Sequence, residues 1–203
     1  MAIPLNALIA SPRRLVTAIV LFVALDLTVL LINLWLTNQL AQDAVAINLA
    51  GRQRMLSQQT TKALLLATRL EDSDSAAAAT RELSASFSLF EQTLTAFAVG
   101  GDTRGGDDGP VTLPPVRGDG AEAIAKAQAL IAPVSALLTE LRSTGTLSPT
   151  QGKTAAAYMV HYNRDILALM NHLTSALERD SVRRAGELRA IQSGAFVLAM
   201  VKD

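Results

Sequence analysis

The chain contains no cysteine and few aromatic residues. The absence of cysteine excludes disulfide bonds, thiol catalysis and thiolate metal sites. The formal net charge is zero, and no compact run of lysine and arginine is interleaved with aromatic residues, so we expect no nucleic-acid partner. The sequence also lacks a nucleophile–base set, a phosphate-binding glycine loop and a paired-carboxylate motif. We therefore predict neither an enzyme nor a cofactor.

Long apolar stretches, in contrast, are present. Half of the residues are hydrophobic, and the run Leu15–Leu36 has the length that a transmembrane helix requires. Arg13 and Arg14 precede this run, whereas residues 37–49 contain no basic side chain. The positive-inside rule therefore predicts that residues 1–14 lie in the cytoplasm and that the chain beyond the span lies outside.

Charged residues near the apolar segments leave two questions open. Asp26 lies near the centre of the predicted span, where it either makes a polar contact between helices of a dimer or is a neutral side chain tolerated by a very apolar helix. Near the other end, Ser193–Val201 is apolar but too short to span a membrane. We interpret residues 191–203 as the start of a truncated second transmembrane helix. The basic residues just before it, Arg183, Arg184 and Arg189, argue against the positive-inside pattern.

The region between these segments, residues 38–190, reads as helical. Apolar residues recur at helical spacing in four segments, Gln39–Leu70, Ala76–Ala98, Ala121–Arg142 and a fourth from Gln151 toward the C-terminus. The glycine-rich segment Gly100–Gly120 separates the second and third and predicts a mobile loop. The sequence thus predicts an all-α protein: an antiparallel up-down-up-down four-helix bundle on an N-terminal transmembrane helix.

Two arginines and a glycine stand out in the uncharged helical run that follows Asp43. At about 100° per residue, Arg54 shares a stripe with Gly51 and lies roughly opposite Leu56, so its side chain points away from its own bundle core. Arg52 lies about 200° from Arg54, so the two guanidinium groups cannot reach the same point. Only one of them is expected to bind a ligand, and Arg54 is the first candidate.

The small residues beside Arg54 predict a helix–helix contact. Ala50 and Gly51 remove side-chain bulk and permit a second helix to approach closely. Two guanidinium groups that face one another repel unless a planar anion lies between them. The segment therefore predicts a receptor for a small oxyanion at a dimer interface, whereas the alternative is a solvated or internally paired arginine. The candidate ligand-binding residues are Arg54, Gly51, Arg52, Ala50 and Asn48.

The segment Asp43–Ser57 also resembles a known family. Its sequence, DAVAINLAGRQRMLS, is similar to the motif D-A-x-x-I-N-x-A-G-x-x-R-M-x-S of the N-terminal sensory domains of nitrate/nitrite sensors and of type IV pilus chemoreceptors of the PilJ type. The matching residues are Asp43, Ala44, Ile47, Asn48, Ala50, Gly51, Arg54, Met55 and Ser57. Weaker similarity continues through Leu89–Gly100 with the following Leu113, Pro114 and Pro115, and through Asn163–Glu178.

The resemblance carries specific expectations. It implies a homodimer in the inner membrane of a bacterium, with a periplasmic sensor domain, no catalytic activity, and a cytoplasmic signalling module in the family architecture. In the nitrate sensors of the family, the arginine of each protomer and the backbone near the glycine hold one anion across the dimer interface. That role falls on Arg54 and Gly51 here, and the expected ligand is nitrate or nitrite. Arg52 occupies a position that varies in the family.

Two functional hypotheses follow. The first is an extracytoplasmic sensor in which binding of an anion shifts the helices of a two-state bundle. The second is a ligand-free helical module of a pilus-type chemoreceptor that dimerises or contacts another protein. Under either hypothesis, Asp43 and Asn48 are expected to hydrogen-bond between helices.

Other polar residues of the predicted fourth helix have weaker functional interpretations. His161 and His172 are separated by about 16 Å along one helix, so they cannot share a metal ion. Tyr158, His161 and Tyr162 form a patch for which bundle packing is the first interpretation and ligand contact the second. Arg183 and Arg184 belong to a charged face that we expect to be solvated.

Overall fold

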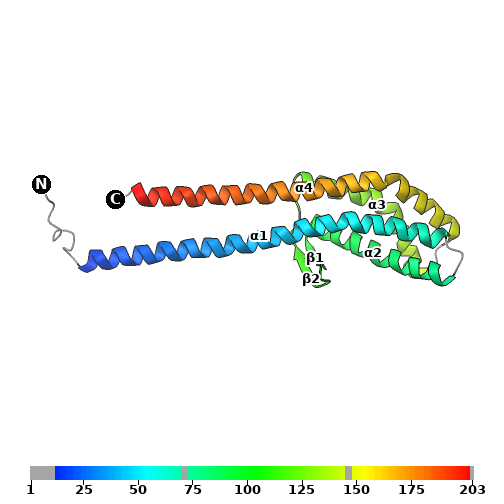
Figure 1. Cartoon of the computed structure of the whole chain (residues 1–203), viewed down its shortest axis with the longest axis horizontal. Helices are drawn as coiled ribbons and strands as arrows, with labels where there is room; N and C mark the ends of the chain where they lie inside the picture. The colour runs from blue at the N-terminus through cyan, green and yellow to red at the C-terminus, as the bar shows by residue number, and fades with distance from the viewer. Residues whose placement is uncertain (1–11, 70–72, 145–147, 202–203) are drawn as a thin grey trace. The chain divides into compact units, whose positions relative to one another are not determined.

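The computed structural model describes residues 12–69, 73–144 and 148–201 of the chain (Figure 1). It divides the chain into two compact units, Met1–Gln42 and Asp43–Asp203. Helix α1, Pro12–Arg69, contributes to both units. Most of the predicted cytoplasmic N-terminus, residues 1–11, lies outside the described residues.

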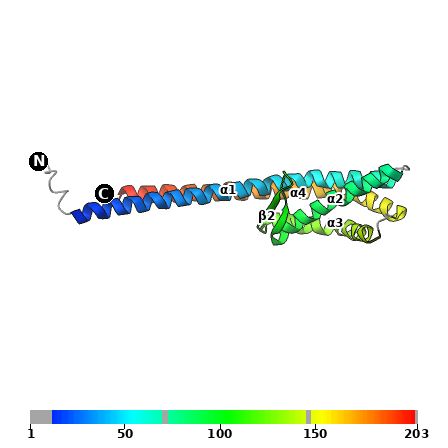
Figure 2. The same ribbon diagram turned by 90° about the horizontal axis from the view of Figure 1, so that it is seen from below.

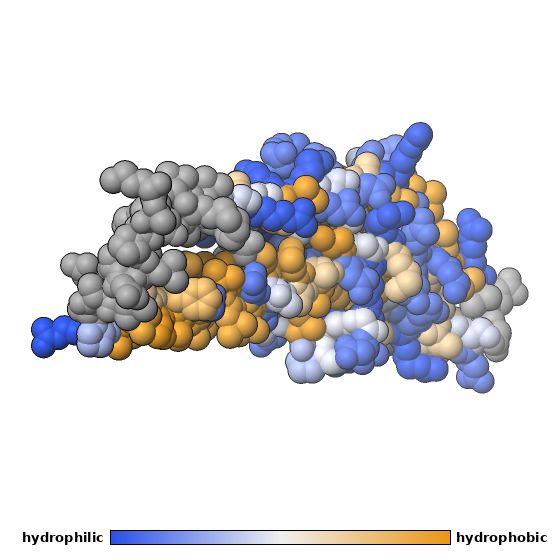
Figure 3. All heavy atoms as spheres, turned by 60° about the vertical axis from the view of Figure 1, so that its left-hand side comes forward, coloured by the Kyte–Doolittle hydropathy of each residue, from blue (hydrophilic) through white to orange (hydrophobic). Residues whose placement is uncertain are grey.

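The first unit contains the predicted membrane-spanning segment. Its large apolar side chains are exposed, apart from the half-buried Ile32 and Leu36, and Figure 3 shows hydrophobic atoms gathered over this part of α1. The helix is long and apolar enough to cross a membrane, and none of its most apolar stretch is buried. The hydroxyl groups of Thr17 and Thr28 donate to the carbonyl oxygens of Arg13 and Ala24, one turn earlier. Such internal pairing is what a lipid environment requires of polar groups.

The second unit is a helical bundle. It combines the later part of α1 with α2 (Ser73–Val99), α3 (Asp119–Thr144) and α4 (Pro149–Val201), and α3 packs against both α2 and α4 (Figures 1 and 2). The prediction of an all-α helical bundle is confirmed. Helix α4 continues without a break through the boundary predicted at residue 191. The predicted limits of the sensor domain and of a second membrane segment therefore stay predictions.

The bundle core is formed by the apolar stripes that the sequence shows. Helix α2 contributes five side chains that are at most 1% exposed, Leu83, Phe87, Phe90, Leu94 and Phe97. They recur every three or four residues, so they lie on one face of the helix. Apolar residues of α1, α3 and α4 belong to the same buried cluster. Burial of these faces is what holds the four helices together.

Helix α3 continues through Pro133, which the sequence marks as a point of kinking. Proline has no N–H group and therefore leaves a helical carbonyl without its usual donor. The hydroxyl of Tyr158 on α4 donates to the carbonyl oxygen of Leu130, at a distance of 3.0 Å. The carbonyl that loses its helical donor is that of Ala129, four residues before Pro133, so the Tyr158 bond ties α4 to α3 beside the proline and does not replace the missing bond.

The prediction of an unstructured linker at Gly100–Gly120 is wrong. Strand β1 (Gly101–Arg104) pairs antiparallel with β2 (Pro110–Leu113), and the hairpin packs against α2. Thr103 and Leu113 are almost completely buried, and the Thr103 hydroxyl lies 2.7 Å from that of Thr93 on α2.

The glycines that suggested disorder instead permit the bends of the hairpin. Gly100 and Gly101 have φ angles of 82° and 134° at the junction with α2, a region that side chains disfavour. At the tip, the N–H of Gly105 donates to the carbonyl oxygen of Gly109. The strands are too short and too polar to produce an alternating apolar pattern in the sequence, so only their packing on α2 identifies them.

Candidate functional site

The motif helix, which we define as residues Asp43–Ser57 of α1, has two different faces. Leu49, Ala50 and Leu56 are at most 3% exposed and belong to the bundle core. Arg54 and Met55 are exposed on the other side. The helical period therefore separates a packing face from a face that is open to a partner or ligand.

Arg54 and Gly51 lie on the open face. Arg54 is exposed, and its guanidinium group forms no hydrogen bond or ion pair with any residue that the structure describes. A Cβ atom added to Gly51 would meet nothing within 4 Å. The protomer thus presents an unengaged cation beside an open stretch of helix. This arrangement suits an interaction with a group that the protomer itself does not supply.

Arg52 lies on the other flank of the same helix and is engaged with the hairpin. Its Nη1 atom donates to the carbonyl oxygen of Gly105, and its Nη2 atom is 3.4 Å from the carboxylate of Asp108. The side chain is only 21% exposed. Arg52 and Arg54 therefore lie on different flanks of the helix, as their angular separation predicts, and the geometry gives Arg52 the role of holding the hairpin tip.

We expect Arg52→Ala to release the hairpin tip without unfolding the bundle. The substitution removes the contacts to Gly105 and Asp108, and charge-assisted hydrogen bonds of this kind are the stronger ones in proteins. Hydrogen exchange of the amides in residues 104–109 should become faster, whereas circular dichroism should show unchanged helicity. Arg104→Ala is the matched control, because Arg104 contacts Arg52 only through its backbone carbonyl oxygen. Equal exchange in both variants would contradict this role for Arg52.

The other two candidate residues have different surroundings. Ala50 is completely buried, so its methyl group packs in the core and does not share the open surface of Gly51. Ala50 and Gly51 therefore face different surroundings, and a role of Ala50 in ligand binding stays a prediction. Asn48 is exposed, and its Nδ2 atom is 3.7 Å from the position that a Cβ atom would take on Gly106. Asn48 thus lies beside the hairpin tip.

An ion pair joins the start of the motif helix to α4. The Nη2 atom of Arg184 lies 2.8 Å from Oδ1 of Asp43, whose side chain is only 8% exposed. The expected contact of Asp43 between helices is confirmed. Arg184 is exposed, as expected for a charged helix face, but it is also ion-paired, because the fold brings together two residues that are far apart in the sequence.

Gln53 is a polar residue of the motif helix that the sequence analysis missed. It is completely buried, and neither its Nε2 nor its Oε1 atom has a hydrogen-bond partner among the described residues. Helical periodicity places it within about 60° of Leu49 and Leu56, so its burial is visible in the sequence. The sequence does not show that the amide of Gln53 lacks a hydrogen-bond partner, because this depends on which groups of the other helices surround it.

The aromatic patch on α4 is a packing feature. The rings of Tyr158 and Tyr162 are 4.5 Å apart, and His161 stacks edge-on against Tyr162 at 4.7 Å. Burial raises the pKa of Tyr158, which keeps its hydroxyl available as a donor to Leu130. These contacts support the first interpretation of the patch. Within the described parts of the chain, no group of three or more acidic or histidine side chains is arranged to hold a metal ion.

Comparison with known proteins gives one match. Residues 35–116 match the family model described as PilJ, type IV pili methyl-accepting chemotaxis transducer N-term. The matched segment includes the motif helix, α2 and both strands of the hairpin. None of the curated proteins and none of the solved structures matches the chain. The match supports the resemblance to a PilJ-type sensory domain and is silent about nitrate or nitrite.

Proposed function

We propose that this protein is the membrane-anchored sensor domain of a chemoreceptor and that it binds a small oxyanion such as nitrate or nitrite. The anion lies between the Arg54 side chains of two protomers in a homodimer. The sensor domain is on the periplasmic side of the bacterial inner membrane. The observation that carries this proposal is the unengaged guanidinium of Arg54 beside the open helical surface at Gly51.

The open face of the motif helix suits a two-fold contact with a second copy. Ile47, Gly51 and Arg54 follow one another at intervals of four and three residues, which places them along one side of the helix. A two-fold axis brings the same stripe of both protomers together, and with it the two Arg54 side chains. Guanidinium groups bind planar oxyanions through paired N–H donors, so an anion converts repulsion between the two cations into attraction.

The contacts of the motif helix offer a route for a signal. The Asp43–Arg184 ion pair links the helix to α4, and Arg52 links it to the hairpin. A ligand changes the balance between two arrangements only through its different affinity for them. An anion that draws two motif helices together acts directly on α1 and, through these contacts, on α4 and the hairpin.

The alternative function is a ligand-free dimerisation or protein-interaction module. The observation that favours it is the exposed side chain of Met55, 54% accessible on the open face. Methionine is a flexible apolar side chain that adapts to partner surfaces. Under this alternative, Arg54 contacts the partner protein and no anion is required.

Calorimetry on the full chain in detergent micelles separates the two functions. Nitrate, nitrite and sulfate are titrated separately, with chloride as the control for general ionic effects. The sensor proposal expects saturable binding of one oxyanion, with one anion per two chains. A dimer that forms without any oxyanion and binds none of the three would contradict the proposal and favour the interaction module.

A further inference from the structure

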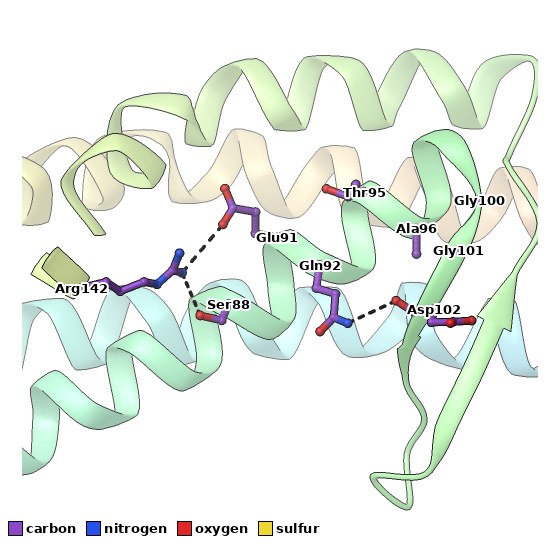
Figure 4. Close-up of a pocket in the computed structure, with 9 residues that line it drawn as sticks. All are labelled: Ser88, Glu91, Gln92, Thr95, Ala96, Gly100, Gly101, Asp102 and Arg142. Carbon is purple, nitrogen blue, oxygen red and sulfur yellow. Dashed lines mark hydrogen bonds and ion pairs between the residues drawn. The ribbon is translucent and has the colours of Figure 1, made fainter. Parts of the chain in front are cut away.

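A groove of about 520 Å³ lies along one face of α2, between the base of the hairpin and α3 (Figure 4). Several of its polar side chains are paired within the protomer. Nη2 of Arg142 is 2.8 Å from the Ser88 hydroxyl oxygen and 3.9 Å from Oε2 of Glu91, and Nε2 of Gln92 donates to the backbone oxygen of Asp102. These contacts hold α3 and the hairpin on α2, so the groove is a packing feature. A polar side chain without such a contact lies in the first unit.

Asp26 is an exposed carboxyl group in the middle of the apolar run Leu15–Leu36. It forms no hydrogen bond or ion pair with any residue that the structure describes. A carboxyl group near the centre of a bilayer is costly, and such residues almost always face another helix or a water-filled cavity. The described part of the protomer does not supply that surface, so the partner of Asp26 is to be sought in another molecule.

Asp26 belongs to a stripe of residues with heptad spacing along α1. One set recurs every seven positions, and a second set lies three positions after its first two members. The first set is Ile19, Asp26, Asn33 and Leu40, and the second is Phe22 and Val29. These are the a and d positions of a two-stranded coiled coil, whose helices face each other along one side. Membrane helices commonly pair with the same geometry, so the stripe predicts a second helix along this side of α1.

The stripe is on an uncovered side of the helix. All six of its residues are exposed. The half-buried apolar side chains of this segment, Ile32 and Leu36, lie about 120° and 80° round the helix from Asp26. The stripe is therefore a surface on which a partner helix can pack.

A second copy of this chain complements the stripe. A protonated carboxyl group has an O–H donor and an acceptor oxygen, so two Asp26 side chains related by a two-fold axis can each donate to the other. The amide of Asn33 also has donors and an acceptor and can meet its own copy about 10 Å further along the helix. Two copies of one chain cross the membrane in the same direction, which places identical residues at the same depth. An entirely apolar partner helix would leave the Asp26 carboxyl facing hydrocarbon.

We propose that two copies of this chain pair through the heptad stripe inside the membrane and that Asp26 and Asn33 form the polar layers of this contact. A polar residue at an a position fixes the register and the number of helices in a coiled coil. Asp26 and Asn33 thus select a parallel, in-register pair over other associations of a very apolar helix. The inference rests on the membrane anchor and the homodimer of the proposed function, but it does not depend on the anion.

Disulfide crosslinking of the full chain in lipid vesicles tests the contact. The chain has no cysteine of its own, so each introduced cysteine reports on one position. Ile19→Cys and Val29→Cys lie on the stripe. Leu21→Cys and Leu31→Cys are the matched controls, because each lies two residues further along, at nearly the same depth but about 140° from Asp26.

A membrane-permeable oxidant such as iodine is expected to link the two stripe variants into dimers and to leave the two controls as monomers. A disulfide requires Cα atoms within about 7 Å of each other, which the proposed contact provides only on the stripe. Crosslinks at all four positions alike, at Leu21 and Leu31 alone, or at none of the four would overturn the contact.

Energy transfer between labelled full chains in vesicles measures the contribution of Asp26 to dimerisation. Asp26→Val is expected to weaken the dimer about fivefold to thirtyfold, the effect of one polar contact between membrane helices. Asp26→Asn keeps a donor and an acceptor and should retain most of the affinity. Thr28→Val is the control, because the Thr28 hydroxyl already donates to Ala24 within its own helix. An Asp26→Val dimer as tight as the unmodified one, or an Asp26→Asn dimer as weak as Asp26→Val, would refute the polar layer.

The outcome is also distinguishable from that of the proposed anion function. Arg54→Ala and the omission of nitrate are expected to leave the crosslinks at Ile19 and Val29 unchanged. Crosslinks that form as expected in a chain that binds no oxyanion would contradict the anion proposal alone. Crosslinks that are lost in Arg54→Ala would show that the membrane contact follows from the anion site, and they would overturn the inference.

Discussion

Arg54→Ala is expected to abolish binding of the oxyanion to the full chain. The dimer loses both guanidinium groups at once, because each protomer contributes one. Each lost hydrogen bond to a charged group weakens binding by about tenfold or more, so the two together are expected to reduce affinity by a factor of about 100 or more. Calorimetry with nitrate and nitrite measures the loss.

Two companion variants establish that the geometry of Arg54 matters. Arg54→Lys keeps the charge but replaces the planar fork by a compact ammonium, and it is expected to weaken binding by about tenfold. Arg52→Ala is expected to have a much smaller effect, because Arg52 is engaged with Gly105 and Asp108 of the hairpin. Anion binding that survives Arg54→Ala but disappears in Arg52→Ala would place the anion site on the flank of the helix that carries Arg52, and not on the flank that carries Arg54.

Gly51→Leu tests the dimer contact separately from the arginine. A side chain at this position meets open space in the protomer, so the fold of each protomer should be preserved. Leucine is also the better helix former by about 1 kcal/mol. We expect the variant to be fully helical and to bind the anion poorly, because the added bulk holds the two motif helices apart. Normal binding would show that the two helices do not approach each other at Gly51.

Gln53→Met is expected to stabilise the bundle. A buried amide without hydrogen bonds costs about 1–3 kcal/mol, and methionine has a similar length without the polar group. Both amide atoms of Gln53 lack a partner among the described residues. The free energy of unfolding should therefore rise by about 1–3 kcal/mol, measured by denaturant titration of the full chain in detergent micelles.

The control for this prediction is the same substitution on the open face. Gln58 is exposed, so Gln58→Met should change the free energy of unfolding by less than about 0.5 kcal/mol. A loss of stability in Gln53→Met would show that the buried amide is hydrogen-bonded in the folded protein. If Gln53→Met is more stable and still binds the anion, but the anion shifts α1 less, then the unsatisfied amide of Gln53 is what keeps α1 able to shift.

Periodicity in the sequence was sufficient to predict the helices and the two faces of the motif helix. Helical hydrogen bonds are local, and an amphipathic stripe such as Leu83–Phe97 records directly which side is buried. The same reasoning placed Arg54 on the open side of α1 and separated it from Arg52. The apolar character of Leu15–Leu36 is equally a property of a single segment.

The sequence alone could not predict features that depend on two distant segments. The hairpin is stabilised by the burial of Thr103 and Leu113 on α2 rather than by an apolar alternation of its own. Its glycine-rich composition is also typical of a disordered linker, so composition favoured the wrong interpretation.

The tertiary structure decided which polar side chains meet. Asp43 and Arg184 are 141 residues apart, and Arg142 meets Glu91 across 51 positions. Ion pairs are short-ranged, so a charge in a helix carries no local sign of its partner. The sequence by itself therefore determined a membrane-anchored helical bundle with an exposed arginine motif. Only the packing of the helices determined the hairpin, the Asp43–Arg184 contact and the unsatisfied Gln53.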